Sequence, residues 1–292
     1  MTDDLFARRD LVRRGVSDSE IRGARRSGAI CPVRRGWYAA QGAMAQLTDE
    51  ERHLVLARAT LGGSGGGSAL SHESAALALG LSLWQGPPDL VHVSVDRASG
   101  SRRSAERYRH CARLDEADVR VVDSMRVTSP ARTVADLACS LTFEEAVCVG
   151  DSAIRVYGID VTDVLDALSR CGRRHGAARA RRAIAFLDGR SESVGESRSR
   201  VYLQRYDVPM PELQVELVAG GRLFRPDFLW RVDRLIGEFD GLAKYSGGGE
   251  TVVQEKLRED ALRAAGWRVQ RWTWAELSDN RLAHRLLGAL KG

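Results

Sequence analysis

The spacing of apolar residues predicts helices and a hairpin at the start of the chain. Residues 5–15 (LFARRDLVRRG) have the pattern of an amphipathic helix. Ser17 and Glu20 have the spacing of a capping box, which opens a second short helix. Residues 29–40 alternate enough to predict a β-hairpin. This order of helix, turn, helix and hairpin is typical of a winged helix-turn-helix.

The middle of the chain mixes strand-like and helix-like stretches. VTSPARTVADLA (127–138) leads from a strand into a helix capped at Ser129, with Pro130 at its first position. Residues 141–190 are predicted to be helical. The pattern therefore indicates a mixed α/β region followed by a helical connector.

Helix-like and strand-like patterns alternate over the last hundred residues. The predicted helices span 194–206, 252–266 and 275–290, and the predicted strands span 212–219, 221–232, 234–240 and 267–274. A tight turn at Val232-Asp233 joins the second and third strands. The order is α-β-β-β-α-β-α.

These patterns predict an α+β multidomain protein of three parts. A winged helix-turn-helix occupies 1–45, an α/β region with an arginine-rich helical connector occupies 46–189, and a third domain occupies 190–292. The length of 292 residues allows each part to bury a core of its own.

Composition excludes several classes of protein. No apolar stretch approaches the roughly 20 residues of a membrane span, and the first ten residues do not resemble a signal peptide. Five cysteines, without CxxC spacing, argue against a disulfide scaffold or a zinc ribbon. We therefore expect a cytoplasmic protein without a membrane partner; the sequence does not indicate its oligomeric state.

Arginine dominates the basic residues: 41 of the 44 are arginine, and the net charge is +5. Two of the three lysines, Lys244 and Lys256, follow Glu238 closely. Where arginine is the default, a lysine suggests a need for a compact point charge.

The first 45 residues carry nine arginines and five acids. Arg22, Arg25 and Arg26 lie on the second predicted helix, and Arg34 and Arg35 lie in the hairpin. Such a helix fits a DNA major groove while the hairpin contacts phosphates. A small helical cap with solvated arginines is the alternative.

Two other polar groups have ordinary interpretations. His72 and Glu73 lack an HExxH partner, so we interpret them as polar residues at the start of a helix. Residues 170–182 contain six arginines and no acid. A solvated face or a linker is the commoner explanation of this run, and a phosphate-binding patch is the alternative.

Acidic residues gather on the predicted hairpin near the C-terminus. Glu238 and Asp240, two apart on one strand, point to the same face, and the turn puts Asp227 roughly opposite them. Converging carboxylates need a cation or shared protons. Oxygen-only ligands suit Mg²⁺ or Mn²⁺. The sequence thus predicts a metal site of Asp227, Glu238 and Asp240, against the alternative of a surface hairpin with solvated acids.

Residues 190–292 resemble the PD-(D/E)XK nuclease superfamily, and within it the Vsr-like endonuclease branch. Pro226-Asp227 is similar to its first acidic signature, and Glu238-Phe239-Asp240-Gly241 to its second. The resemblance implies a restriction-endonuclease-like αβββαβ domain that hydrolyses DNA phosphodiester bonds with Mg²⁺. It also implies a supporting role for Glu196 in the leading helix and places Asp260 at the acid of the closing helix.

One position departs from the family pattern. The lysine expected two residues after the second acid is replaced by Asp240. Lys244, or Lys256 from the following helix, then supplies the ammonium group from another position. The substitution makes metal binding the firmer expectation and hydrolysis the weaker one.

The N-terminal half is similar to AbiEi-type antitoxins of toxin–antitoxin systems. The similar segments are residues 5–39, SHESAAL (71–77) and VTSPARTVADLA (127–138). This resemblance implies DNA binding and a cognate toxin as a partner. The alternative function is therefore a non-enzymatic antitoxin or transcriptional regulator with a degenerate nuclease domain.

Overall fold

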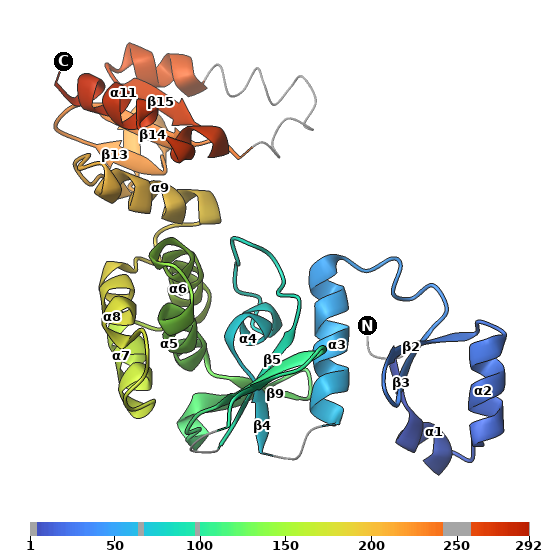
Figure 1. Cartoon of the computed structure of the whole chain (residues 1–292). Helices are drawn as coiled ribbons and strands as arrows, with labels where there is room; N and C mark the ends of the chain where they lie inside the picture. Colours follow the sequence, from blue (N-terminus) through green and yellow to red (C-terminus); the bar gives the residue numbers. More distant parts are fainter. Residues whose placement is uncertain (1–4, 64–66, 97–99, 242–257, 292) are drawn as a thin grey trace. The chain divides into compact units, whose positions relative to one another are not determined.

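The computed structural model describes residues 5–63, 67–96, 100–241 and 258–291. Its contacts define two compact units of mixed α and β structure (Figure 1). Unit 1 contains residues 1–141 and 159–181, and unit 2 contains residues 142–158 and 182–292. The division differs from the expected boundaries at 45 and 189, because residues 142–158 pack with the C-terminal part of the chain.

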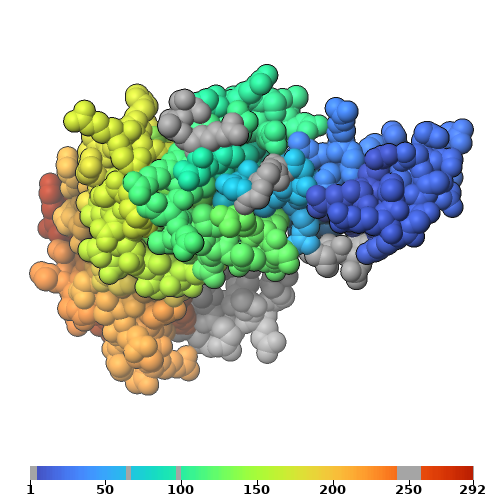
Figure 2. Space-filling view, turned by 90° about the horizontal axis from the view of Figure 1, so that it is seen from below, coloured from blue at the N-terminus to red at the C-terminus, as the bar shows by residue number. Residues whose placement is uncertain are grey.

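The N-terminal part of unit 1 is a small three-stranded sheet with two helices. Its elements are β1 (Leu5–Ala7), α1 (Arg8–Arg13), α2 (Asp18–Arg26), β2 (Ile30–Arg34) and β3 (Trp37–Ala40), with strand order β1-β3-β2. All strand pairs are antiparallel. Its surface, dark blue in Figure 2, forms one continuous lobe. The helix predicted over 5–15 is corrected here: residues 5–7 form an edge strand, because they pair with β3.

Local signals in this lobe behave as the sequence predicts. The Ser17 hydroxyl accepts from the Glu20 backbone N–H, and the Glu20 carboxylate accepts from the Ser17 N–H at 2.8 Å. Gly36 turns β2 into β3 with a φ of +77°, a conformation that glycine adopts without strain. The predicted capping box and hairpin are confirmed.

A six-stranded mixed sheet forms the rest of unit 1, in the order β6-β7-β5-β4-β9-β8. The strands are β4 (Ser68–Leu70), β5 (Val91–Val95), β6 (Arg102–Arg103), β7 (Arg107–Cys111), β8 (Val119–Val122) and β9 (Met125–Thr128). The helices are α3 (Asp49–Gly62), α4 (His72–Ala78), α5 (Pro130–Ser140), α7 (Val161–Arg170) and the 3₁₀ turn η1 (Glu116–Asp118). Figure 1 shows α3 and α4 beside β4 and β5. Ser129 caps α5 and Pro130 is its first residue, as predicted.

Unit 1 buries a network of charges beneath α5. Arg132 is fully buried and meets Asp118 at 2.7 Å and Asp136 at 3.1 Å. Arg170 pairs with Asp118 at 2.9 Å, and Arg174 pairs with Asp136. Each buried carboxylate therefore has two guanidinium partners, which offsets the desolvation of the charges.

Unit 2 is built on a four-stranded sheet of order β10-β13-β14-β15. Its strands are β10 (Glu212–Leu213), β13 (Phe228–Trp230), β14 (Leu235–Phe239) and β15 (Arg268–Trp272), and β11 (Leu217–Ala219) with β12 (Arg222–Phe224) forms a separate hairpin. The helices are α6 (Phe143–Tyr157), α9 (Val194–Arg205), the 3₁₀ helix η3 (Trp274–Ser278) and α11 (Arg281–Leu290). Residues 258–264 are also helical. The chain passes from unit 1 to unit 2 within α8 (Ala177–Phe186).

Two of the predicted strands are each broken in two. The stretches 212–219 and 221–232 each contribute one strand to the main sheet and one to the small hairpin. Pro226 lies in the second break, where a residue without an N–H group cannot donate to a ladder. The other predicted strands, the turn at Val232-Asp233 and the helix at 194–206 match the structure within a few residues.

Alternating residues of the sheet supply two hydrophobic cores. One core joins α9 and α11 to Phe228, Trp230, Leu235 and Trp272. The other joins the β11–β12 hairpin to Leu229, Ile236 and Leu262. The side chains that alternate onto this second face therefore lie beside the helix of residues 258–264.

Segment 142–158 contributes a buried acid, Asp151, to its contacts with the rest of unit 2. Asp151 accepts from the backbone N–H of Asp188 at 2.7 Å, from Ser197 Oγ at 2.8 Å and from Arg200 at 2.7 Å. Burial raises the pKa of Asp151 to about 6 despite these donors.

In the described parts of the chain, no helix is long and apolar enough to cross a membrane.

Candidate functional site

Asp227 and Glu238 lie on the same face of the unit 2 sheet. Phe228 pairs with Gly237 in the antiparallel register of β13 and β14, so the preceding and following residues also lie opposite each other. The backbone N–H of Phe239 donates to Asp227 Oδ2 at 2.9 Å. The predicted approach of these two acids is confirmed.

A glutamine joins Asp227 to the leading helix of unit 2. Gln214 Nε2 donates to Asp227 Oδ1 at 3.1 Å and to Glu196 Oε2 at 2.9 Å. Glu196 also accepts from the Glu192 N–H at 2.9 Å and from Ser193 Oγ at 2.8 Å. The buried Glu196 carboxylate is thus held in place by three donors and positions Gln214 against Asp227.

The charge of Asp227 is poorly compensated. Its pKa is raised to about 6, first by burial and then by the negative charges of Glu196 and Glu238. The hydrogen bonds from Phe239 and Gln214 act in the opposite direction but are weaker. A carboxylate in this setting gains stability from a cation.

Two arginines compensate Glu238 instead. Arg258, in the helix that covers this face, approaches Glu238 Oε1 at 2.7 Å, and Arg271 on β15 approaches Oε2 at 3.3 Å. Arg271 also lies 3.5 Å from Glu259. The side chain of Glu238 is only 12% exposed. Both oxygens of the Glu238 carboxylate therefore lie beside guanidinium groups.

The predicted trio of Asp227, Glu238 and Asp240 is corrected here: these residues are all described, but they do not form a group whose ligand oxygens all lie within 4.8 Å of one another. Asp240 continues β14, since its N–H donates to the Trp272 carbonyl at 2.8 Å. Asp260 is exposed on the helix of residues 258–264. Lys244 and Lys256, proposed as the catalytic ammonium groups, lie outside the described residues.

The sequence reasoning missed Gln214, Arg258 and Arg271. Gln214 lies between two short strands with a φ of +51°, which no sequence pattern indicates. Arg271 becomes visible only when β15 is paired in parallel with β14, which brings it opposite Glu238. The alternating pattern of residues 267–274 was the available signal, but it did not specify the neighbouring strand.

Close packing fixes the backbone around the acids. A Cβ atom on Gly195 would lie 2.0 Å from the Phe239 ring, and one on Gly237 would lie 2.5 Å from the Trp272 ring. These contacts hold α9 and β15 against β14. Glycine at both positions therefore sets how closely Glu196 and Glu238 approach Asp227.

Four of the five arginines predicted to bind DNA are exposed. These residues are Arg22, Arg25, Arg26 and Arg35. Arg34 differs, because its side chain is 16% exposed and pairs with Glu106 at 2.9 Å. The four exposed guanidinium groups remain available to phosphates, whereas Arg34 already has an acidic partner.

The arginine run at 170–182 is partly structural. Arg170 and Arg174 belong to the buried charge network, and Arg179 donates to the Cys139 carbonyl at 2.7 Å. Arg173, Arg181 and Arg182 are exposed. Neither a purely solvated face nor a continuous phosphate patch describes this segment.

Comparisons with known proteins supply similarity but no named activity. The chain is 31% identical over 149 residues to two Mycobacterium tuberculosis proteins, "Uncharacterized protein MT2308" of strain CDC 1551 / Oshkosh and "Uncharacterized protein Rv2248" of strain H37Rv. The match covers 51% of this chain and 55% of theirs, so the chain spans about half the length of these curated relatives. No family model matches the chain. The crystal structure of the RV2827C protein from Mycobacterium tuberculosis aligns with 75% of this chain and 84% of its own, at 17% identity and a TM-score of 0.44.

Proposed function

We propose that this chain is a DNA-binding protein whose C-terminal unit is a Mg²⁺-dependent endonuclease. The observation that carries the proposal is the approach of Asp227 and Glu238 on one sheet face, with the pKa of Asp227 raised to about 6 by burial and by neighbouring acids. A purely structural surface hairpin has no need of such an arrangement.

The residues present fit a hard divalent cation. Asp227 and Glu238 offer carboxylate oxygens on one face of the sheet. A bound Mg²⁺, or Mn²⁺, supplies Lewis acidity for a phosphoryl oxygen and for an attacking water. Gln214 and Glu196 orient the Asp227 carboxylate, and Arg258 and Arg271 provide positive charge beside the position of a substrate phosphate.

The fold of the C-terminal unit supports this proposal. Helix α9, strands β10, β13 and β14, the helix of residues 258–264 and the parallel strand β15 follow each other in an α-β-β-β-α-β order, which is the order of the proposed core. Asp227 immediately precedes β13, and Glu238 lies on β14.

The N-terminal lobe supplies DNA affinity in this proposal. The order of α1, α2 and the β2–β3 hairpin supports a winged helix-turn-helix, and α2 carries Arg22, Arg25 and Arg26 on an exposed surface. Arg35, in the turn between β2 and β3, lies where a wing contacts phosphates. Contacts of this type are electrostatic and weaken as salt increases.

The proposal is tested by nicking of supercoiled DNA in Mg²⁺ or Mn²⁺. We expect Asp227→Ala and Glu238→Ala to lower the cleavage rate at least about 100-fold, since each removes a metal ligand. Glu216→Ala, which removes an exposed acid of the same unit, serves as the matched control. Cleavage that persists in Asp227→Ala excludes this site as the catalytic centre.

A second candidate function has one observation in its favour. Arg258 and Arg271 both pair with Glu238, as expected of a nuclease-like domain that has become a binding platform. The chain would then be a non-enzymatic AbiEi-type antitoxin or transcriptional regulator with a toxin partner. Wild-type protein that binds DNA yet leaves plasmid, linear duplex and RNA intact with either metal supports this second function.

A further inference from the structure

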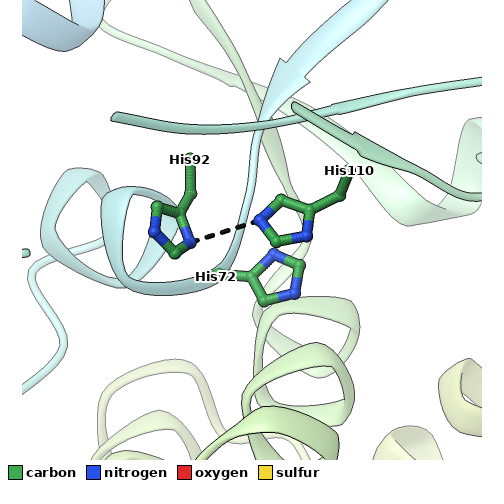
Figure 3. Close-up of side chains that lie close together, drawn as sticks. All are labelled: His72, His92 and His110. Carbon is green, nitrogen blue, oxygen red and sulfur yellow. Dashed lines mark hydrogen bonds between the residues drawn. The ribbon is translucent and has the colours of Figure 1, made fainter. Parts of the chain in front are cut away.

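Three histidines from separate elements of unit 1 converge on one point. His92 lies on β5 and His110 on β7, two strands paired in parallel, and His72 is the first residue of α4 (Figure 3). One ring nitrogen from each histidine lies within 4.8 Å of the other two. The three imidazoles therefore lie close together at the start of α4.

The three side chains are of the type that binds transition-metal ions. Each imidazole offers a nitrogen lone pair in its neutral form, and the three ring nitrogens lie within 4.8 Å of one another.

The contacts of His92 leave a polar atom without a hydrogen bond. Its Nδ1 lies 3.3 Å from His110 Nε2 and 3.0 Å from Glu73 Oε2. One ring nitrogen carries either a hydrogen or a lone pair, so it satisfies only one of these neighbours. Glu73 Oε2 is buried, and His92 Nδ1 is the ring nitrogen that faces it. A metal ion beside Nδ1 would satisfy the lone pairs and the carboxylate together.

Ring packing holds the cluster together. The His72 ring stacks on that of His110 with centroids 3.8 Å apart, and the Tyr108 ring lies 4.0 Å from the His110 ring on the same strand. The lone pairs of stacked rings lie in nearly parallel planes, so an ion bound by all three histidines requires one of these two rings to rotate.

We propose that His72, His92 and His110 bind one divalent transition-metal ion of the zinc class, with Glu73 neutralising part of its charge. Imidazole nitrogens select Zn²⁺, Co²⁺, Ni²⁺ or Cu²⁺ over Mg²⁺. With Zn–N bonds of about 2.0–2.1 Å in a tetrahedron, two ligand nitrogens lie roughly 3.3–3.4 Å apart. The separation of His92 Nδ1 and His110 Nε2, 3.3 Å, matches this edge.

The site is structural and independent of the carboxylates of unit 2. Its ligands join the start of α4 to two neighbouring strands of the large sheet. An ion at this position fixes the helix against the sheet, and its binding stabilises the folded form of unit 1 by mass action.

Binding is tested with the untagged full-length chain, stripped with EDTA and kept in excess Mg²⁺ to occupy the carboxylate site. Titration with Co²⁺, followed by visible absorption and calorimetry, is expected to show one equivalent bound in tetrahedral geometry and displaced by Zn²⁺. His92→Gln and His110→Gln are each expected to weaken binding at least roughly 100-fold. Loss of a group that only orients a metal ligand already costs about 10- to 100-fold in metal affinity, and loss of the ligand itself costs at least as much. His284→Gln, at an exposed histidine outside the cluster, is the matched control and keeps wild-type binding.

A second measurement guards against variants that fail to fold. Electron paramagnetic resonance of wild-type protein with one equivalent of Cu²⁺ is expected to show coupling to several imidazole nitrogens. An all-oxygen spectrum, absence of stoichiometric Co²⁺ binding to the wild type, or undiminished binding in folded His92→Gln and His110→Gln variants would each overturn the proposal. Far-UV circular dichroism of the metal-free variants establishes that they are folded.

Discussion

Arg271 lies opposite Glu238 in the parallel pairing of β14 and β15, and its Nε atom is 3.3 Å from Glu238 Oε2. The same guanidinium group approaches Glu259 at 3.5 Å. A fixed positive charge thus lies beside the acid that is proposed to bind the metal. This positive charge affects the affinity of the site for a cation and for a substrate phosphate.

Removal of this positive charge is expected to strengthen metal binding and weaken catalysis. In Arg271→Gln, the affinity for Mn²⁺ should rise roughly 3- to 10-fold, because repulsion between the two cations is lost. The rate of plasmid nicking should fall, because a group beside the substrate phosphate is lost. Calorimetry and nicking assays measure the two effects, with the exposed Arg231→Gln as control. Weaker Mn²⁺ binding in Arg271→Gln would contradict this view of the site.

The pKa of Asp227 predicts how its contribution to stability varies with pH. The folded protein keeps this proton to about pH 6, whereas an unfolded chain releases it near the usual value of 3.8. The folded state binds more protons in this window, so stability due to Asp227 falls as pH rises from about 4 to 6. Without metal, wild type should lose up to about 3 kcal/mol relative to Asp227→Asn across this range.

Urea denaturation in EDTA at several pH values measures this difference, since other titrating groups cancel between the two proteins. Saturating Mg²⁺ should reverse the trend, because the cation favours the ionised carboxylate. Glu216→Gln controls for the loss of one exposed negative charge. Wild type that instead gains stability relative to Asp227→Asn from pH 4 to pH 6 in EDTA would show that Asp227 is compensated in the folded protein.

The exposed arginines of α2 predict the salt dependence of DNA binding. Replacement of Arg22, Arg25 and Arg26 by alanine should reduce the slope of log K against log salt by about 3, or about 1 per phosphate contact. Fluorescence anisotropy with duplex DNA at several salt concentrations measures the slope. The control replaces Arg102, Arg103 and Arg126, which are also exposed. Equal slopes for the two triple variants would place the DNA contacts elsewhere.

The buried charge network predicts a large loss of stability in unit 1. Arg132→Ala leaves Asp118 and Asp136 buried with one guanidinium partner fewer each. We expect a loss of about 3–5 kcal/mol in the free energy of unfolding. Arg126→Ala, at an exposed arginine of β9, should change it by less than about 0.5 kcal/mol. Chemical denaturation measures both, and similar losses in the two variants would show that the network does not stabilise the fold.

Local elements follow closely from local residue patterns in this protein. The capping box of Ser17 and Glu20, the Ser129-Pro130 helix start and the β13–β14 turn were all predictable, because each depends on residues a few positions apart. Alternation also predicted that Asp227 and Glu238 share a face, since a tight turn fixes the register of the strands it joins.

Pairings between distant segments were not predictable in this way. The sequence alone determined the order of most elements, the acidic hairpin and the arginine-rich start of the chain. Only the tertiary structure decided that residues 142–158 join the C-terminal unit, that Arg271 pairs with Glu238, and that His72, His92 and His110 meet. The reason is physical: hydrogen bonds between neighbouring residues fix helices and turns, whereas the choice of neighbouring strand and helix depends on burial summed over the whole core.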